Sequence, residues 1–402
     1  MSRIRLSILL SLLLLLASQA FAGRKLPDSI VLSPEVMYVT KKRIIERDPA
    51  LMPAYKKLIK EADRAVNSPA ESVVLKAKPG PSGNLHDYWS ISPYWWPNPD
   101  TPDGLPYIRR DGEHNPEADS DKYDRMRMHR MSRDAITLAL AWYLTGDEEY
   151  AGKGTALVWS WCNDSVTRTS PNMDYAQGRP GISEGHHTGI IETRDLIRVA
   201  DAAKILEPSM AWSKVVTRNL NRWFTNYIDW LINSEFGKLE AQSTNNHGTW
   251  FDAQVAVYAS YVGDKKLARS VVSTANIRRI IRQIERDGSM PFELERTRSR
   301  HYTFFNLEAF FVLASVAERM DMDLWNWSDP AGPSIQKAFD FAAANIDPNK
   351  PWPHGETGKF DPFAFTPLFH RAAVVYKDDR YLELLKTLPA DQLERDRAKL
   401  FY

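Results

Sequence analysis

The stretch from Ser243 to Trp250 combines side chains that could do chemistry with the start of a helical pattern. Asn245 and Asn246 could simply cap that helix, because an asparagine side chain accepts hydrogen bonds from the free backbone N–H groups at a helix start. Capping does not account for His247. An imidazole at the positive end of a helix has a lowered proton affinity, which suits a base. The sequence therefore leaves a structural and a catalytic interpretation open for this stretch.

A second stretch, Glu295 to Tyr302, is a dense basic run that ends in a tyrosine. Charge runs are usually solvated faces of a protein. This one is followed directly by the aromatic residues that begin at Phe304, so some of its groups should lie near the scaffold. A guanidinium beside a phenol also favours the phenolate, because nearby positive charge stabilises the charged form. We therefore expect the pKa of Tyr302 to be lowered by its basic neighbours.

A third stretch, Gly185 to Arg194, contains His186 and His187. Adjacent histidines suggest a metal site, but neighbouring side chains on a helix diverge, and no Asp or Glu stands at the spacing of zinc proteases. We expect no metal here. The stretch could contribute to a binding cleft. Alternatively, the two histidines are loop residues, and Glu192 and Arg194 form a surface pair.

The first two motifs resemble the alginate lyase superfamily, the helical-toroid polysaccharide lyases. They are Asn-Asn-His-Gly-Thr-Trp-Phe-Asp and, some fifty residues on, Glu-Leu-Glu-Arg-Thr-x-Ser-x-x-Tyr-x-x-Phe-Asn-Leu-Glu-Ala. The resemblance covers about Tyr88 to Leu324. It implies that Asn246 and Arg296 bind a uronate carboxylate, whereas His247 and Tyr302 handle protons. It also implies an anionic polysaccharide as substrate and no cofactor.

These residue types suit β-elimination, which removes the proton from C5 of a uronate and expels the oxygen from C4. Donors that neutralise the carboxylate make the C5 proton accessible, and each is typically worth a few kcal/mol. In mannuronate and glucuronate the proton and the oxygen lie on the same side, so Tyr302 alone could serve both. In guluronate they lie on opposite faces, and His247 would act as base with Tyr302 as acid.

Other residues are expected to bind neighbouring sugars. A long irregular segment from Lys76 to Asp121 is rich in aromatic residues, whose flat faces stack on sugar rings; the alternative is that they plug the end of the core. The predicted substrate-binding residues are Asn245, His186, His187, Arg194, Arg300, His301, Tyr94, Trp95 and Trp96.

Two other functions remain open at this point. A glycoside hydrolase would use paired carboxylates, and Glu192, Asp252 and Glu308 lie near the motifs. A glycan-binding protein of the cell envelope would use the Trp-rich segment without catalysis. That second alternative leaves the joint presence of His247, Arg296 and Tyr302 unexplained.

The elements that must position these residues are helical. Apolar residues recur at three- and four-residue spacing, which predicts an all-α fold. Short turns at Gly146-Asp147 and Gly263-Asp264 join successive helices, which suggests helical hairpins stacked in an α/α toroid, as an incomplete or closed barrel. No strand stands out. The predicted helical stretches are Met131–Leu144, Ile190–Leu206, Trp223–Ile232, Trp250–Tyr261, Phe304–Ala317 and Ile335–Ala344.

The first residues predict export. Arg3 and Arg5 precede an apolar run from Ile8 to Ala17 and then a small-x-small site ending at Ala22, the pattern of a signal peptide. We expect a leader at 1–22 and one catalytic domain at 23–402, periplasmic or otherwise extracellular. No later stretch is long enough for a membrane span.

The charge of the chain is balanced, with 52 basic and 51 acidic residues. Basic groups for a polyanion must therefore be gathered locally, and we expect no nucleic-acid partner. Cys162 is the only cysteine, so the chain can form no internal disulfide, and its stability must come from core burial. The oligomeric state cannot be deduced from these features.

Overall fold

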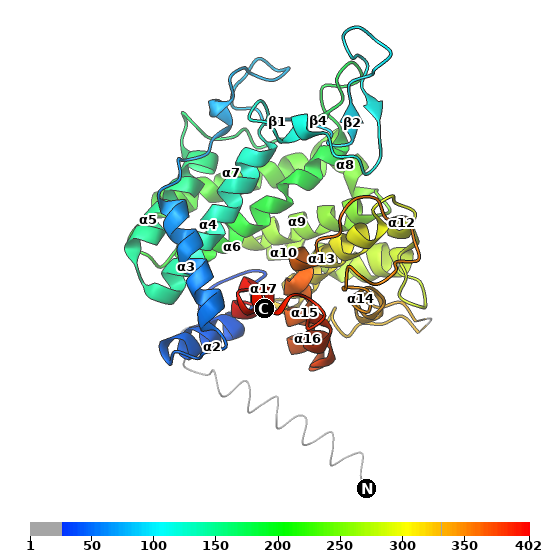
Figure 1. Cartoon of the computed structure of the whole chain (residues 1–402). Helices are drawn as coiled ribbons and strands as arrows, with labels where there is room; N and C mark the ends of the chain where they lie inside the picture. Colours follow the sequence, from blue (N-terminus) through cyan, green and yellow to red (C-terminus); the bar gives the residue numbers. More distant parts are fainter. Residues whose placement is uncertain (1–25, 331) are drawn as a thin grey trace.

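Two kinds of helix make up the computed structural model, which describes residues 26–330 and 332–402. In α9 (Asn246–Val262), 14 of 17 residues are buried, whereas only four of the 15 residues of α3 (Met52–Val66) are buried. A helix that is apolar all round belongs inside a fold, and an amphipathic helix covers it. The predicted all-α toroid is confirmed, with inner helices wrapped by outer ones (Figure 1). The predicted leader lies outside the described residues.

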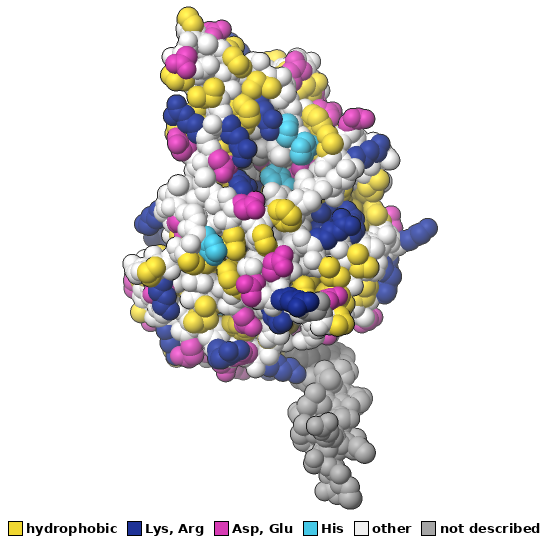
Figure 2. Space-filling model, turned by 90° about the vertical axis from the view of Figure 1, so that its right-hand side faces the viewer, with side chains coloured by type: hydrophobic (Ala, Val, Ile, Leu, Met, Phe, Trp, Pro, Cys, Tyr) yellow, Lys and Arg dark blue, Asp and Glu magenta, His cyan; other side chains and the backbone are white. Residues whose placement is uncertain are grey.

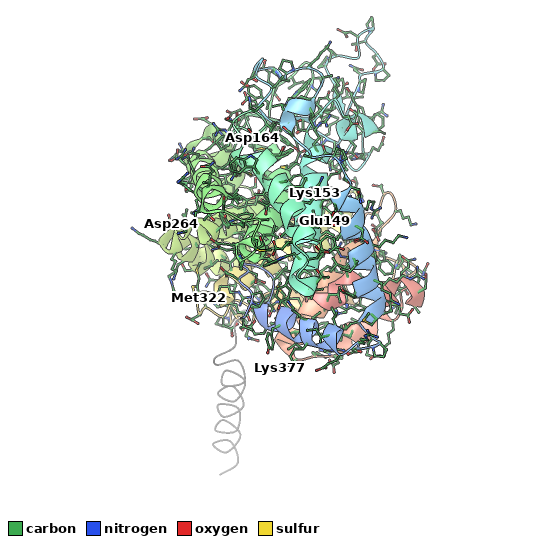
Figure 3. All side chains as sticks on the ribbon, turned by 90° about the vertical axis from the view of Figure 1, so that its left-hand side faces the viewer. Glu149, Lys153, Asp164, Asp264, Met322 and Lys377 are labelled. Atoms are coloured by element: carbon green, nitrogen blue, oxygen red, sulfur yellow. The ribbon has the colours of Figure 1, made fainter. Side chains whose placement is uncertain are left out.

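The inner helices carry the functional motifs, and the outer helices pack against their backs. The inner helices besides α9 are α4 (Arg125–Thr145), α6 (Leu196–Leu206), α13 (Ser299–Glu318) and α15 (Thr366–Tyr376). The covering helices besides α3 are α5 (Glu148–Val158), α7 (Lys214–Asn233), α10 (Lys265–Ala275) and α14 (Ile335–Ala343). On the outer surface α5 runs beside α3 and turns Glu149 and Lys153 outward (Figure 3).

Six further helices complete the described part of the chain. They are α2 (Pro34–Ile45), α8 (Glu235–Ala241), α11 (Ile281–Gln283), α12 (Pro291–Leu294), α16 (Arg380–Leu385) and α17 (Ala390–Glu394). Single 3-10 turns are η1 (Val73–Leu75), η2 (Pro116–Asp119), η6 (Pro362–Phe365) and η7 (Arg397–Leu400), and π-helical turns are η3 (Trp159–Asn163) and η5 (Asn276–Ile280). Within the described residues no helix is long and apolar enough to span a bilayer.

The two predicted Gly-Asp turns are confirmed. Gly146 and Gly263 end α4 and α9 with φ of 76° and 83°, a left-handed conformation that costs glycine little. The aspartate that follows each glycine then caps the next helix. Asp147 accepts a hydrogen bond from the backbone N–H of Glu149, and Asp264 accepts one from Leu267. In each turn the glycine ends one helix and the aspartate begins the next, so the connection is compact.

One predicted helix is wrong in its first half. The stretch from Ile190 was expected to be α-helical, but a tighter 3-10 helix, η4 (His187–Asp195), precedes α6. Gly189 lies against Ala176, where an added Cβ would come within 2.4 Å of the alanine methyl group. Tertiary contacts of this kind override the helical periodicity of the sequence.

The absence of strands was also predicted wrongly. The rim above α9 contains β1 (Trp89–Ile91), paired parallel with β4 (Tyr175–Gly178), and β2 (Trp95–Trp96), paired antiparallel with β3 (Ile108–Arg109) (Figure 1). Strands of two to four residues are too short to show an alternating pattern in a sequence. The Trp-rich segment is thus a folded rim that faces the ends of the inner helices.

Candidate active site

The two motifs meet at one cavity of about 850 Å³. Asn246 and His247 open α9, and Arg296 and Tyr302 flank the start of α13, which packs against α9. All four side chains line this cavity. Figure 2 shows histidine side chains beside a hollow near the top of the molecule, with Lys and Arg side chains around it.

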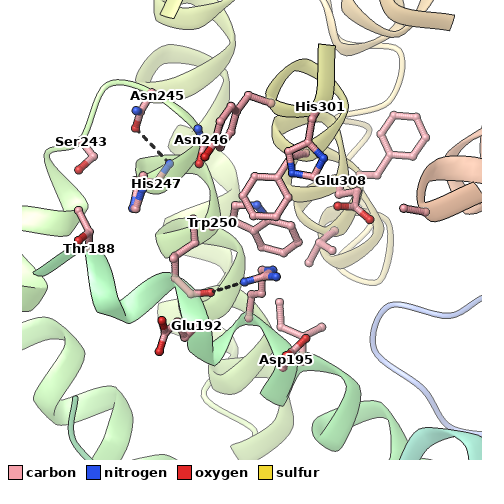
Figure 4. Close-up of a pocket in the computed structure, with 18 of the residues that line it drawn as sticks. Thr188, Glu192, Asp195, Ser243, Asn245, Asn246, His247, Trp250, His301 and Glu308 are labelled. Atoms are coloured by element: carbon pink, nitrogen blue, oxygen red, sulfur yellow. Dashed lines mark hydrogen bonds between the residues drawn. The ribbon is translucent and has the colours of Figure 1, made fainter. Parts of the chain in front are cut away.

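The two asparagines have different environments. Asn245 is the helix cap, since its side-chain oxygen accepts a hydrogen bond of 3.2 Å from the backbone N–H of His247 (Figure 4). Asn246 is fully buried, and its Nδ2 donates to Oε2 of Glu293 at 2.7 Å. Its backbone N–H donates to the other carboxylate oxygen at 2.6 Å. Glu293 therefore fixes the orientation of the Asn246 amide.

Glu293 also connects the two motifs, because the charges of Arg296 and His247 both act to lower its pKa. Burial raises the pKa of Glu293 to about 7, although its hydrogen bonds from Asn246 lower it. Its position was not predicted from the sequence. The only signal was its place as the first residue of the second motif.

A second buried carboxylate, Glu240 of α8, orients His247. Oε1 of Glu240 lies 2.6 Å from Nδ1 of His247, and Oε2 lies 2.8 Å from Nδ1 of His187. Burial opposes the charge of Glu240, but the two imidazoles outweigh it and hold the pKa of the carboxyl below its usual value. A carboxylate only accepts hydrogen bonds, so Nδ1 carries the hydrogen in both rings. In each ring only Nε2 is left for a substrate.

Tyr302 has a different environment from the one predicted. The guanidinium carbon of Arg296 lies 3.9 Å from the centre of its ring, and its hydroxyl lies 2.7 Å from the hydroxyl of Tyr94. Burial, together with Tyr94, raises the pKa of Tyr302 despite the lowering effect of Arg296. The prediction of a lowered pKa is wrong because the sequence shows the neighbouring charge but not the burial. The free protein therefore holds Tyr302 as a neutral phenol.

Arg296 is held from the rim. Its Nη2 donates to Oδ1 of Asp111 at 3.0 Å, and Thr297 donates to the other oxygen at 3.1 Å. Burial opposes ionisation of Asp111, but these bonds hold its pKa below the usual value. Asp111 follows β3 and was not singled out from the sequence, because 185 residues separate it from Arg296.

Most predicted substrate-binding residues line the cavity, and three do not. The lining includes Asn245, His187, Arg194, His301, Tyr94 and Trp95. Trp96 instead donates its indole N–H to the carbonyl of Glu113. His186 pairs with Thr188, and burial lowers its pKa to about 4.

Arg300 is the clearest correction among these residues. It is buried, forms an ion pair of 2.8 Å with Glu356, and donates to the carbonyls of Asp347 and Lys350. It therefore fastens the C-terminal segment to α13. His354 in that segment is exposed and does not line the cavity.

Two of the three carboxylates considered for a hydrolase are held by hydrogen bonds or an ion pair within the protein. Glu192 accepts hydrogen bonds from Tyr88 and Ser90 at 2.7 and 2.8 Å. Asp252 forms a buried ion pair with Arg279. In residues 26–330 and 332–402, no group of three or more His, Cys, Asp or Glu side chains is placed to hold a metal ion.

Comparisons with known proteins agree on one family. Residues 72–352 match the family described as Alginate lyase. The crystal structure of an alginate lyase from Bacteroides ovatus is 33% identical, covers 94% of this chain and 99% of its own, and superposes with a TM-score of 0.87. Alginate lyase A1-III from Sphingomonas species A1 is 16% identical over 74% of this chain and 78% of its own, with a TM-score of 0.48. No curated protein matches the chain.

Proposed function

Because this chain belongs to the alginate lyase family and is thus a polysaccharide lyase, we propose that it cleaves alginate or a related uronate polymer by β-elimination in the cavity described above. Glucuronan is a further candidate substrate. A hydrolase or a non-catalytic glycan-binding protein is not the function that we propose.

One observation carries this proposal: an amide, an imidazole, a guanidinium and a phenol from two distant motifs line the same cavity. Asn246 and Arg296 would bind the uronate carboxylate. Asn246 keeps one Nδ2 hydrogen beyond its bond to Glu293, and Arg296 keeps donors beyond its bonds to Asp111. Because these donors are held in place before the substrate arrives, they need little reorganisation to stabilise the developing enolate.

The proton steps follow from the partners of the two remaining residues. Tyr302 enters the reaction as a neutral phenol, so it can give its proton to the oxygen that leaves C4. His247 offers Nε2 as the base for the C5 proton, since its Nδ1 is engaged by Glu240. This division of labour fits guluronate, in which the two atoms lie on opposite faces.

For mannuronate and glucuronate we propose that Tyr302 serves as both base and acid. Tyr302 must first lose its proton to solvent, and one neighbour assists this step. Arg296 stabilises the phenolate by its positive charge, which opposes the effect of burial and of the Tyr94 hydroxyl. Cleavage of guluronate should therefore depend on His247 more strongly than cleavage of mannuronate does.

The test is to incubate the purified protein with polymannuronate, polyguluronate, glucuronan and hyaluronan while following near-ultraviolet absorbance. A lyase makes a C4–C5 double bond conjugated with the carboxylate, which absorbs, whereas a hydrolase makes none. We expect absorbance to rise with at least one alginate block. Shortened chains without absorbance, or no cleavage of any polymer, would overturn the proposal.

We further propose that residues 23–402 act as a single catalytic unit outside the cytoplasm, with the periplasm as the first location to test. One continuous hydrophobic core extends from Ile30 to Phe401, which supports one unit. The leader pattern of the sequence supports export. Fractionation of cells that express the full chain tests this location.

A further inference from the structure

The cavity continues below the catalytic residues, along the same two helices. On α13, Phe305 and Glu308 follow Tyr302 at three-residue intervals, and on α9 Trp250 follows His247 by three. Residues three apart lie on the same helix face, about one turn deeper into the toroid. All of them line the cavity, and Figure 4 shows His301 and Glu308 across from Trp250. We call this deeper part the chamber.

Two opposite charges face the chamber without pairing. Among the described residues, the only hydrogen bond that Arg194 donates goes to the carbonyl of Ile191 at 3.2 Å. Its guanidinium otherwise lies 5.0 Å from the centre of the Phe305 ring. Glu308 accepts no hydrogen bond from any described residue and forms no ion pair with Arg194. Burying charged groups without partners is costly, so such groups often mark a binding site.

Neighbouring charges in the same region do pair, so this arrangement is specific to Arg194 and Glu308. Asp195, the next residue along η4, binds Arg198 at 3.0 Å and His129 at 2.9 Å. Arg194 is thus the charged residue of this turn whose side chain remains available to a ligand.

Aromatic rings supply the walls of the chamber. His301 stacks on Phe305 with ring centres 5.8 Å apart and an angle of 12° between their planes, and Trp250 lies 5.3 Å from Phe305. Burial lowers the pKa of His301 to about 3, with Arg298 and Arg194 adding to the effect, so the imidazole is neutral near pH 7. The chamber therefore offers flat, uncharged surfaces between one cation and one carboxyl group.

We propose that the chamber binds one uronate unit of the polymer, adjacent to the unit held by the catalytic residues. Arg194 would bind its carboxylate, Glu308 would accept a hydrogen bond from a ring hydroxyl, and Phe305 would contact its apolar face. A neutral sugar would leave Arg194 unpaired, and an inorganic anion without hydroxyl groups would leave Glu308 unpaired. The proposal rests on the function proposed above, and it assigns Arg194 and Glu308 to substrate length and charge specificity.

The experiment measures kcat/KM for purified uronate oligomers from dimer to hexamer. In the wild-type protein, kcat/KM should rise at the length at which a unit fills the chamber. Arg194→Met should reduce that rise by about 10- to 100-fold, the usual value of a charge-assisted hydrogen bond. Arg222→Met is the matched control, because Arg222 is exposed on α7 and does not line the cavity. The same dependence on length in Arg194→Met and in the wild type would overturn the proposal.

A binding measurement without turnover separates this proposal from the proposed function. The hexamer should bind Tyr302→Phe about 10- to 100-fold more tightly than it binds the double variant Tyr302→Phe/Arg194→Met. Equal affinities would sink the chamber proposal even if the wild type is a lyase. If the wild type made no unsaturated product, the lyase would fail while this affinity difference could still hold. Arg194→Lys, which keeps the charge and loses the planar fork, replaces Arg194→Met if the methionine variant does not fold.

Discussion

The part of the cavity lined by Asn246, His247, Arg296 and Tyr302, which we call the mouth, differs from the chamber beneath it in how its polar side chains are held. At the mouth every reactive side chain is held by a partner. The pairs are His247 with Glu240, Asn246 with Glu293, Arg296 with Asp111 and Tyr302 with Tyr94. In the chamber Arg194 and Glu308 have no such partners among the described residues. The groups that we assign to chemistry are thus fixed in advance, whereas the groups that we assign to binding are left available.

The carboxyl groups of the two regions show the physical consequence. Glu240 at the mouth is buried but receives hydrogen bonds from two imidazoles, and its pKa stays below the usual value. Glu308 in the chamber is partly buried, and this burial raises its pKa to about 7, although Arg194 and Arg198 lower it. Two imidazole donors keep the buried Glu240 charged, whereas neither the neutral donors of Asn246 at Glu293 nor the distant charges near Glu308 offset burial.

The largest effect should come from removing the phenol of Tyr302 at the mouth. Tyr302→Phe loses the acid that protonates the leaving oxygen, so kcat should fall by about 10²- to 10⁴-fold on every polymer that is cleaved. Circular dichroism should be unchanged, because only the hydrogen bond to Tyr94 is lost. The measurement is the rate of absorbance increase under saturating polymer. Full activity in this variant would remove Tyr302 from the mechanism.

A smaller effect should follow from Glu240→Gln, which alters positioning without touching the substrate. A glutamine has one accepting oxygen, so only one of the two Nδ1 hydrogens can still be accepted. The other ring must adopt the opposite tautomer and lose its free Nε2 lone pair. If His247 is that ring, kcat on polyguluronate should fall by about 100-fold with a smaller change in KM, and the pH profile should shift.

Glu235→Gln is the control for this variant, because Glu235 is exposed on the same short helix. It should leave kcat, KM and the pH profile at wild-type values. A purely structural role for Glu240 would lower the thermal stability of Glu240→Gln while its pH profile stayed unchanged, and that outcome would contradict the positioning role.

The sequence was sufficient for the scaffold and for the residues at the centre of the mouth. Periodicity found the inner helices, and the Gly-Asp turns located their ends, because both signals are local. The residues that hold the mouth together were missed. Glu293 lies 47 residues from Asn246 and Asp111 lies 185 from Arg296, so no local pattern links them.

The spacing of residues in the sequence also did not predict the direction in which each side chain points. Arg300 and Tyr302 are two positions apart on α13, and such residues point to different sides of a helix. Arg300 therefore faces Glu356 on the outside of the cavity, although it belongs to the same basic run as Arg296. The raised pKa of Tyr302 escaped prediction for a related reason, since burial depends on the packing of segments distant in sequence.

The smallest effect concerns the chamber and is a change in stability. The pKa of Glu308 is about 7 in the folded protein, against an ordinary value of 4.5. Between these values the unfolded chain releases the proton while the folded protein keeps it, so stability falls as pH rises through this window and stays low above it. Glu308→Gln removes the penalty. It should be no more stable than wild type near pH 4 and more stable by at most about 3 kcal/mol near pH 8.

Chemical unfolding of the wild type and of Glu308→Gln at several pH values measures the gap between their free energies of unfolding. Glu285→Gln is the control, because Glu285 is exposed. The gap should open between about pH 4.5 and 7 for Glu308→Gln only. A gap that stays constant with pH would mean that Glu308 ionises as easily in the chamber as in water. The chamber would then be open to solvent like an ordinary surface groove, and the contrast with the mouth would disappear.

Saturating hexamer should narrow this gap in stability, because a bound uronate would give the Glu308 carboxylate the hydrogen-bond donor that it otherwise lacks.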